Sequence, residues 1–506
     1  MKNSSKPVYL YLSLLSALLF LNLSFTYEVL GVGIFFYLLS LLCAVLFAPS
    51  RRQLFYFVLL VGVINCAIQL NFFYGLFKTA AIPLYAILAI WVALPCLLTR
   101  ILLDRFGHKA ILCFPFMWTA CEFFRSELYY LKFSWLSGGM ALSHPFYNGL
   151  PGLFGFYGVS FIFLLIVAVA IVIPKSRYKP FAGLLIIPAL CMSYIQPKQN
   201  RPGPNVLGVQ LEYPFEQQVL AHLEKNIERY PETELIVLSE YSFPGDIPAS
   251  IREFCKTNNV YLIAGGKVKK PGSAESGIPM KIGKGKKGAD RNWYNTAFVI
   301  NPQGETEFTQ VKSVPIQFFN DGLPAPKQEL WKSPWGKIGL AICYDLSYSK
   351  VMDELISQGA EALIIPTMDA IKWGEYEHRL HAKMPIVRAR EYGIEIFRVA
   401  SSGISQHVSA RGKLLAETNF PGQGEQIYSK LLMHPKATVP VDRAIAYLSI
   451  FFSLIAMAFL LIKKKSLVHE KPIESEELVE VEEPALGSLC MVIAVTALVS
   501  IFSKEN

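Results

Sequence analysis

The chain has 506 residues, of which 53% are hydrophobic and only 17% charged, and its mean hydropathy is +0.36. This composition excludes an ordinary soluble protein and predicts a membrane protein. The net charge of +9 comes from basic residues scattered through short loops and one lysine-rich segment, so nucleic-acid binding is not expected.

Apolar runs long enough to cross a bilayer lie on both sides of a polar central segment. A bilayer core about 30 Å thick requires roughly 20 apolar residues per helix. Seven such runs precede the polar segment and two follow it, at 8–24, 28–48, 54–72, 79–98, 110–125, 151–173, 180–195, 444–462 and 487–503. The first run lacks a small-residue cleavage site, so we interpret it as a retained anchor.

The predicted domains follow from these runs. They are a membrane domain at 1–196, a globular domain at 197–440, a transmembrane helix at 441–465, an acidic linker at 466–486 and a further transmembrane helix at 487–506.

Basic residues in the short loops predict the orientation of the chain. They alternate along the chain so that every basic loop falls on one side, at Lys2, Lys6, Arg51, Arg52, Arg100, Arg105, Lys109, Lys175, Arg177, Lys179, Lys463, Lys464 and Lys465. That side is expected to be the cytoplasm. An odd number of preceding spans then places the globular domain on the outer side of the membrane, and the acidic linker inside.

The loop between the fifth and sixth runs, 121–148, is rich in aromatic residues and is expected on the same side as the globular domain. Two interpretations are open: it anchors helix ends at the membrane interface, where Trp and Tyr are common, or it forms a wall of an active site that faces lipid.

The nine cysteines do not predict disulfides or a metal site. Seven lie in apolar runs, which leaves Cys255 and Cys343. There is no CxxC motif and no Cys/His cluster with zinc spacing, so no metal or cofactor is expected.

The globular segment alternates short apolar runs with helical patterns, which predicts an α/β fold whose strands are covered on both faces. The runs include NVLGVQ, ELIVLSE, VYLIAGG, NTAFVIN, KIGLAI and EALIIPT. Val351, Met352, Leu355 and Ile356 share one face of an expected helix, and Gly359 is expected to end it.

Three of the expected strands end in a residue that can carry chemistry. Glu240 follows ELIVLS, Lys312 follows the strand near 307–311, and Cys343 follows KIGLAI. A thiol nucleophile requires a base and a cation that stabilises an oxyanion, and these three side chains supply that set. Singly, each has an ordinary alternative: a packed core cysteine, a surface carboxylate and a surface lysine.

Several segments resemble the nitrilase, or carbon–nitrogen hydrolase, superfamily. They are SPWGKIGLAICYDLSYSKVMDELISQGAEALIIPT, ELIVLSEYSFP, YNTAFVINPQGE, QVKSVP and RAREYGIEIFRVASSGISQHVSARGKLLAET. The resemblance implies a four-layer αββα sandwich with Glu240, Lys312 and Cys343 as catalytic residues. It also implies that Tyr344 and Asp345 support the oxyanion and the turn.

Such a domain after several membrane spans is similar to the apolipoprotein N-acyltransferase family of bacterial inner membranes, whose catalytic domain faces the periplasm. The resemblance implies acyl transfer from a phospholipid to Cys343 as a thioester, and then to the α-amine of a diacylglyceryl apolipoprotein. The membrane lipids are thus both surroundings and substrate. Trp135, Asn295 and Gln317 are expected to contact substrate.

This chain departs from the family pattern in the loop after Lys312, which is short and has Gln317 near the place of a second Glu, and in the turn Cys-Tyr-Asp. Two alternatives therefore stay open: a membrane-tethered amidase that uses water as acceptor, and a catalytically inactive scaffold. If the alignment with the family pattern is shifted after Lys312, Lys327 is the lysine that would take its place.

Two further groups of residues are kept outside the expected site. Residues 267–291, rich in lysine, are interpreted as a solvated hairpin tip or a contact with anionic headgroups. His378 and His381 are interpreted as surface or packing residues.

Overall fold

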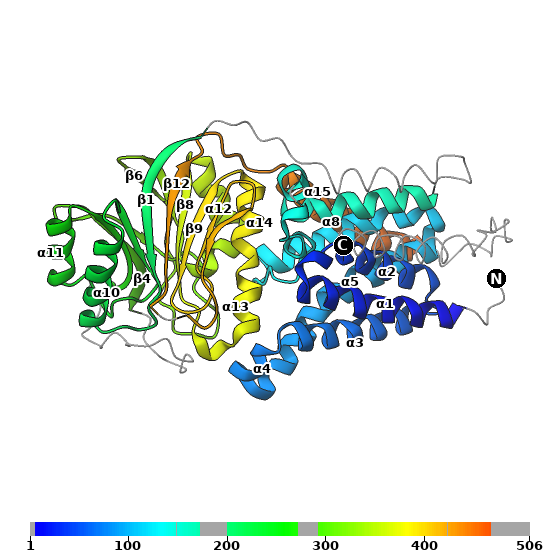
Figure 1. The fold of residues 1–506 in the computed structure, drawn as a ribbon. Helices are drawn as coiled ribbons and strands as arrows, with labels where there is room; N and C mark the ends of the chain where they lie inside the picture. Colours follow the sequence, from blue (N-terminus) through cyan, green and yellow to red (C-terminus); the bar gives the residue numbers. More distant parts are fainter. Residues whose placement is uncertain (1–5, 148, 173–199, 272–291, 423, 467–506) are drawn as a thin grey trace, which may run out of the picture.

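The structure is a computed structural model, and it describes residues 6–147, 149–172, 200–271, 292–422 and 424–466. A helical half and a half built on two β-sheets lie end to end (Figure 1). The helical half comes from both ends of the described chain, because the last helix packs beside the earlier ones.

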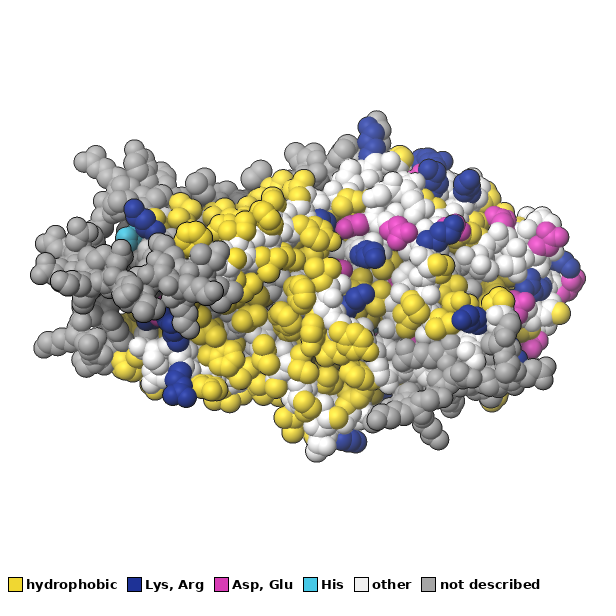
Figure 2. Space-filling view, turned by 180° about the vertical axis from the view of Figure 1, so that it is seen from behind, with side chains coloured by type: hydrophobic (Ala, Val, Ile, Leu, Met, Phe, Trp, Pro, Cys, Tyr) yellow, Lys and Arg dark blue, Asp and Glu magenta, His cyan; other side chains and the backbone are white. Residues whose placement is uncertain are grey.

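The helical half consists of α1 to α8 and α15. Their bounds are α1 Lys6–Thr26, α2 Gly33–Phe47, α3 Arg51–Gln69, α4 Phe72–Phe77, α5 Ala81–Phe106, α6 Phe114–Phe123, α7 Gly138–Ala141, α8 Gly149–Val172 and α15 Asp442–Ser466. On the face seen in Figure 2, apolar side chains cover much of this half, whereas charged side chains lie over the other. This distribution is that of a protein with one half in lipid and one in water.

Within the described residues, five helical segments are long and apolar enough to cross a membrane: 7–26, 51–69, 72–106, 149–172 and 442–460. Two other predicted spans form helices that are shorter than these five. The run at 28–48 forms α2, which has only 15 residues, and the run at 110–125 forms α6, which has 10 residues. The predicted spans at 180–195 and 487–503 and the acidic linker lie outside the described residues.

The other half contains two six-stranded sheets, ordered β12-β1-β2-β3-β4-β5 and β11-β10-β9-β8-β7-β6. The strand bounds are β1 Arg201–Val209, β2 Leu235–Leu238, β3 Tyr261–Lys269, β4 Trp293–Ile300, β5 Thr306–Val311, β6 Leu330–Ser333, β7 Gly336–Leu340, β8 Ala362–Thr367, β9 Glu395–Ala400, β10 Gln406–Val408, β11 Leu414–Glu417 and β12 Gln426–Met433. In each sheet the parallel strands are central, β1-β2-β3 and β7-β8-β9.

The two sheets face one another, and helices cover their outer sides. α10 (Glu216–Arg229) and α11 (Ala249–Asn258) cover the first sheet, while α12 (Ser349–Ser357) and α14 (Lys383–Tyr392) cover the second (Figure 1). The fold is thus the predicted αββα sandwich. α12 also confirms the predicted helix, because the four apolar side chains of its predicted face are buried.

The two halves are joined by buried polar contacts. The backbone N–H of Phe156 in α8 donates to Glu391 of α14 (3.1 Å). Arg443 pairs with Glu391 (2.7 Å). Since buried polar groups are costly unless they are paired, these contacts fix how the sandwich sits on the helices.

Candidate active site

Cys343 lies at the turn after β7, where a 3-10 turn, Cys343–Ser347, begins. Its φ is +53°, a conformation that non-glycine residues rarely adopt and that costs about 1–3 kcal/mol. The buried carboxylate of Asp345 holds this turn, because it accepts hydrogen bonds from the N–H groups of Ile342, Ser313 and Val314 (2.7–3.1 Å). Asp345 thereby ties the nucleophile turn to the loop that follows Lys312.

Glu240 lies at the end of β2 and is also fully enclosed by protein. The next residue, Tyr241, has a φ of +61°, so the chain turns sharply here as well. Gly265 of β3 permits this turn: a Cβ atom on it would lie 2.6 Å from the Cα of Glu240. A glycine is required where two backbones approach this closely.

Lys312 lies directly after β5 and its ammonium sits between two buried carboxylates. Nζ is 2.9 Å from Glu240 Oε1 and 2.8 Å from Asp321 Oδ2. The second carboxylate oxygen of Glu240 accepts a hydrogen bond from the backbone N–H of Met368 (2.8 Å). The Cys343 thiol donates to the backbone carbonyl of Met368 (3.7 Å). The three side chains predicted from the strand ends are therefore brought together.

Asn295 of β4 completes the surroundings of Glu240. Its Nδ2 donates to Glu240 Oε1 (2.5 Å), and also lies within hydrogen-bond distance of the Tyr241 hydroxyl (2.7 Å) and Asp321 (3.1 Å). The Tyr241 hydroxyl in turn donates to Asp321. Asn295 is thus a partner of the carboxylates, and it is not among the residues that line the cavity described below.

Burial and charge set the protonation states in this cluster. Burial and the nearby Glu240 carboxylate raise the pKa of the Cys343 thiol well above its usual value. Burial also raises the pKa of Glu240, against the opposing effect of Lys312. Burial alone would lower the pKa of Lys312, but the carboxylates of Asp321 and Glu240 outweigh it and hold that pKa high. At neutral pH these shifts keep Cys343 as a thiol and Lys312 as an ammonium.

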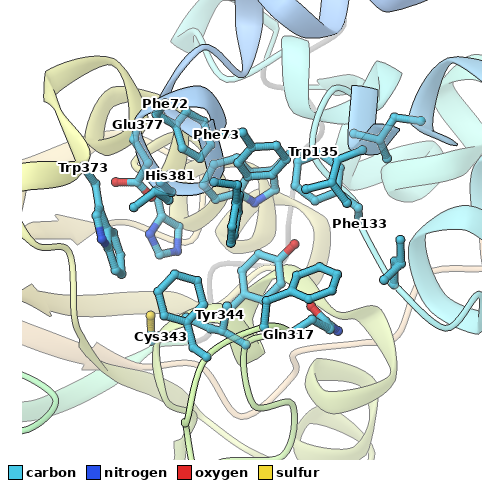
Figure 3. A pocket seen from close by; sticks show the side chains of 18 residues that line it. Phe72, Phe73, Phe133, Trp135, Gln317, Cys343, Tyr344, Trp373, Glu377 and His381 are labelled. Atoms are coloured by element: carbon cyan, nitrogen blue, oxygen red, sulfur yellow. The ribbon is translucent and has the colours of Figure 1, made fainter. Parts of the chain in front are cut away.

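A cavity of about 890 Å³, part of it open to solvent, lies between the two halves and reaches Cys343. Most of its lining is apolar, and it comes from α4, α5, the loop 131–135 and the loop 316–319. In Figure 3, Cys343, Tyr344 and Gln317 lie on one side of it, and the rings of Phe72, Phe73 and Trp135 lie on the other. Such a lining suits an acyl chain.

Of the three residues predicted to contact substrate, Trp135 and Gln317 line this cavity and Asn295 does not; Tyr344, predicted to support the oxyanion, also lines it. The Trp135 indole N–H donates to Ser347 of the nucleophile turn (3.2 Å). Trp135 belongs to the aromatic loop after α6, so this loop forms part of the wall, as the second interpretation of the loop expects.

The structure corrects two other assignments. Lys327 is largely exposed and pairs with Glu329, so it does not replace Lys312. Lys267 is buried, with its ammonium 5.0 Å from the ring centre of Tyr241, because the strand β3 continues through it; it does not belong to an exposed hairpin tip. The rest of the lysine-rich segment, at 272–291, lies outside the described residues.

Sequence reasoning missed Asp321, Glu377 and His381. Of the two interpretations of His378 and His381, as surface or packing residues, the surface alternative is wrong, since both are buried, and His381 lines the cavity together with Glu377. Glu377 and His381 are four residues apart on α13 (Glu375–His381), a spacing that places two polar side chains on one helix face. This spacing is the feature of the sequence that could have indicated that Glu377 and His381 act together. Asp321 lies in a loop and has none.

Asp369, Glu377 and His381 form a buried cluster whose ligand atoms lie within 4.8 Å of one another, close enough to hold a metal ion. However, the guanidinium of Arg398 already pairs with Asp369, and a fixed positive charge there opposes the binding of a cation. The donor set fits an ion-pair network better than a metal centre.

Comparison with known proteins matches both halves of the chain. Residues 14–169 match the apolipoprotein N-acyltransferase N-terminal domain, and residues 209–428 match the carbon-nitrogen hydrolase family. Together the two segments cover most of the chain.

Similar proteins include the apolipoprotein N-acyltransferases of Shewanella oneidensis and Haemophilus ducreyi. The first is 22% identical over 70% of this chain and 76% of its own length. The second is 24% identical over 65% and 71%. Among solved structures, Saccharomyces cerevisiae Nit3 of the nitrilase superfamily aligns with a TM-score of 0.37 and 19% identity, over 47% of this chain and 93% of Nit3. With the two domains matched in this order, the chain belongs to the apolipoprotein N-acyltransferase family.

Proposed function

We propose that this protein transfers an acyl chain from a phospholipid, through a thioester on Cys343, to the α-amino group of the N-terminal diacylglyceryl-cysteine of apolipoproteins. One observation carries this proposal: Cys343 faces an apolar cavity whose wall is shared by the helical half and the sandwich. A small polar amide would gain little from that lining, whereas each buried methylene of an acyl chain contributes about 0.8 kcal/mol.

In the first half-reaction, Glu240 accepts the thiol proton as the sulfur attacks the ester carbonyl. The developing oxyanion is stabilised by the Lys312 ammonium and by the backbone N–H of Tyr344. The C–O bond then breaks, and Glu240 returns the proton to the departing lysophospholipid alcohol. A general base is required because the Cys343 thiol, with its raised pKa, is protonated at neutral pH.

In the second half-reaction, the neutral amine of the acceptor attacks the thioester carbonyl. Glu240 takes a proton from the attacking nitrogen and passes it to the Cys343 sulfur as the C–S bond breaks. Lys312 stabilises the second oxyanion as it did the first. The products are an amide on the lipoprotein and the free thiol, so the enzyme is regenerated without a cofactor.

We expect the sandwich to face the periplasm, where outer-leaflet lipid and secreted lipoproteins are both present. Described residues at the far end of the helices include Arg51, Arg100 and Arg105, and the basic-loop rule assigns that end to the cytoplasm. Reporters fused after residue 51 or 105 should be cytoplasmic, and reporters within 200–440 external. A cytoplasmic signal from the sandwich would contradict this orientation.

Acyl transfer is tested with labelled phospholipid and a diacylglyceryl-cysteinyl peptide. Cys343→Ala should abolish both the hydroxylamine-labile label on the enzyme and the N-acylated peptide. Cys255→Ala is the matched control, because Cys255 is buried on α11 away from the cavity, and it should retain both. Release of free fatty acid without N-acylated peptide would instead favour a hydrolase that uses water.

A further inference from the structure

His381, on α13, presents its imidazole to the same cavity as Cys343. The side chain is 2% exposed, and its ring centre lies 5.4 Å from that of Trp135. In Figure 3 the imidazole ring points from the helix into the cavity, in the same part of the view as Cys343. The mechanism described above gives this imidazole no role.

The contacts of His381 define which ring nitrogen carries the proton. Nδ1 is 2.8 Å from Asp369 Oδ1, and the other carboxylate oxygen of Asp369 pairs with Arg398. Nδ1 also lies 3.1 Å from Nη2 of the Arg398 guanidinium, but that nitrogen already donates to Asp369. We therefore assign Nδ1–H as the donor to the Asp369 carboxylate, which leaves Nε2 with its lone pair. Nε2 is buried and has no hydrogen-bond partner among the described residues. This nitrogen is therefore a free acceptor at the cavity.

The groups that face His381 leave the imidazole neutral. Burial lowers the pKa of His381, against the effect of Asp369, and burial raises the pKa of Glu377 well above its usual value, which favours the uncharged form of that carboxyl. Burial opposes ionisation of Asp369, but His381 and Arg398 outweigh it and hold its pKa low. The remaining neighbours are His378 on the same helix and the Cys343 and Tyr344 side chains across the cavity. The negative charge of Asp369 and the positive charge of Arg398 thus balance one another beside the neutral imidazole of His381.

The second half-reaction needs such a base. An α-amino group has a pKa of about 8 and is mostly an ammonium at neutral pH. It must lose one proton before it attacks the thioester, and a second proton as the amide forms. In the proposed mechanism Glu240 transfers only the second proton, from the nitrogen to the sulfur. Its two carboxylate oxygens already accept hydrogen bonds from Lys312, Asn295 and the Met368 N–H.

We propose that His381 Nε2 accepts the first proton from the α-ammonium of the acceptor, with Asp369 orienting the ring and stabilising the imidazolium. This inference rests on the proposed function. The N–H bond of the ammonium breaks, the proton passes to Nε2 and then to water, and the neutral amine attacks the thioester. The first half-reaction does not involve His381, because a phospholipid ester brings no ammonium that must react.

The test separates the two half-reactions in the full-length protein. His381→Asn keeps an N–H group that can donate to Asp369 but removes Nε2. His378→Asn is the matched control, because His378 is also buried with an unpartnered Nε2 but does not line the cavity. Thioester formation is measured with labelled phospholipid, and single-turnover transfer from the loaded enzyme to a diacylglyceryl-cysteinyl peptide is measured from pH 6.5 to 9.5.

The expected result is a thioester rate for His381→Asn within about threefold of wild type, and a transfer rate about tenfold lower at pH 7, where only about a tenth of the acceptor amine is neutral. The deficit should shrink to a few-fold at pH 9.5, where the amine is neutral without help. His378→Asn should resemble wild type in both steps. An equal deficit at all pH values, or an equal loss of thioester formation, would show a structural role and overturn the inference. If the wild type itself forms a thioester but acylates no peptide, the proposed function fails instead.

Discussion

Replacing Asp321 by Asn should shift the pH dependence of thioester formation toward lower pH. The carboxylates of Glu240 and Asp321 contact the same Lys312 ammonium at 2.9 and 2.8 Å, so their contacting oxygens lie within about 6 Å of each other. At an effective dielectric constant of about 20, two unit charges at that distance interact by about 3 kcal/mol. Burial and Lys312 have the largest effects on the pKa of Glu240. The negative charge of Asp321 comes next and raises that pKa.

Glu240 acts as a base only when it is ionised, so its pKa sets the acidic limb of the pH–rate profile. Removing the charge of Asp321 lowers that pKa, and 3 kcal/mol corresponds to about 2 pH units. We therefore expect the limb to move down by about 1 to 2 units. The plateau rate should fall by about tenfold, because a carboxylate of lower pKa is a weaker base.

The measurement is single-turnover formation of the Cys343 thioester from labelled phospholipid between pH 4 and 8. Asp246→Asn is the control, because Asp246 is a carboxylate of the same domain with its side chain 69% exposed and paired with Arg252. Its profile should match wild type. A limb that stays in place, or moves to higher pH, in Asp321→Asn would refute the electrostatic coupling of Glu240 and Asp321.

Two further variants test how the site is held. Gly265→Ala places a Cβ atom 2.6 Å from the Glu240 backbone, so thioester formation should fall at least tenfold and stability by about 1–3 kcal/mol; Gly245→Ala, with open space around it, should do neither. Arg443→Met leaves Asp442 without its buried ion-pair partner and removes one of the two arginines that pair with Glu391, so it should lower the melting temperature by an amount consistent with about 3–5 kcal/mol. Arg51→Met removes a pair whose arginine is 49% exposed and should cost at most about 1 kcal/mol.

The meeting of Glu240, Lys312 and Cys343 could be predicted because each lies just after a strand, β2, β5 or β7, and the ligand sites of α/β folds gather at strand ends. Asp321 and His381 could not be predicted in that way. One lies in a loop and the other on a helix, and only the packing of those segments against the sheets brings them to Lys312 and Cys343. Local sequence carries little information on such long-range placement.

The membrane helices show a related limit. The run at 28–48 is as apolar as a span, yet α2 has 15 residues and most of them are buried. Hydropathy reports how apolar a segment is, but it does not distinguish contact with lipid from contact with other helices. Lys267 shows the converse, because a lysine-rich run predicts exposure while this side chain is buried beside the rings of Tyr241 and Trp293.

The shared cavity explains why the nitrilase chemistry suits acyl transfer in this chain. In the proposed reaction the thioester must survive until the acceptor amine arrives, so water has to be kept from its carbonyl. The cavity walls near Cys343 are formed by Phe77 of α4, Leu88 of α5 and Trp135, all supplied by the helical half. An isolated sandwich would lose these walls and expose the thioester. The membrane helices therefore do more than anchor the enzyme: they provide the apolar surface that favours an amine acceptor delivered by a lipid over water.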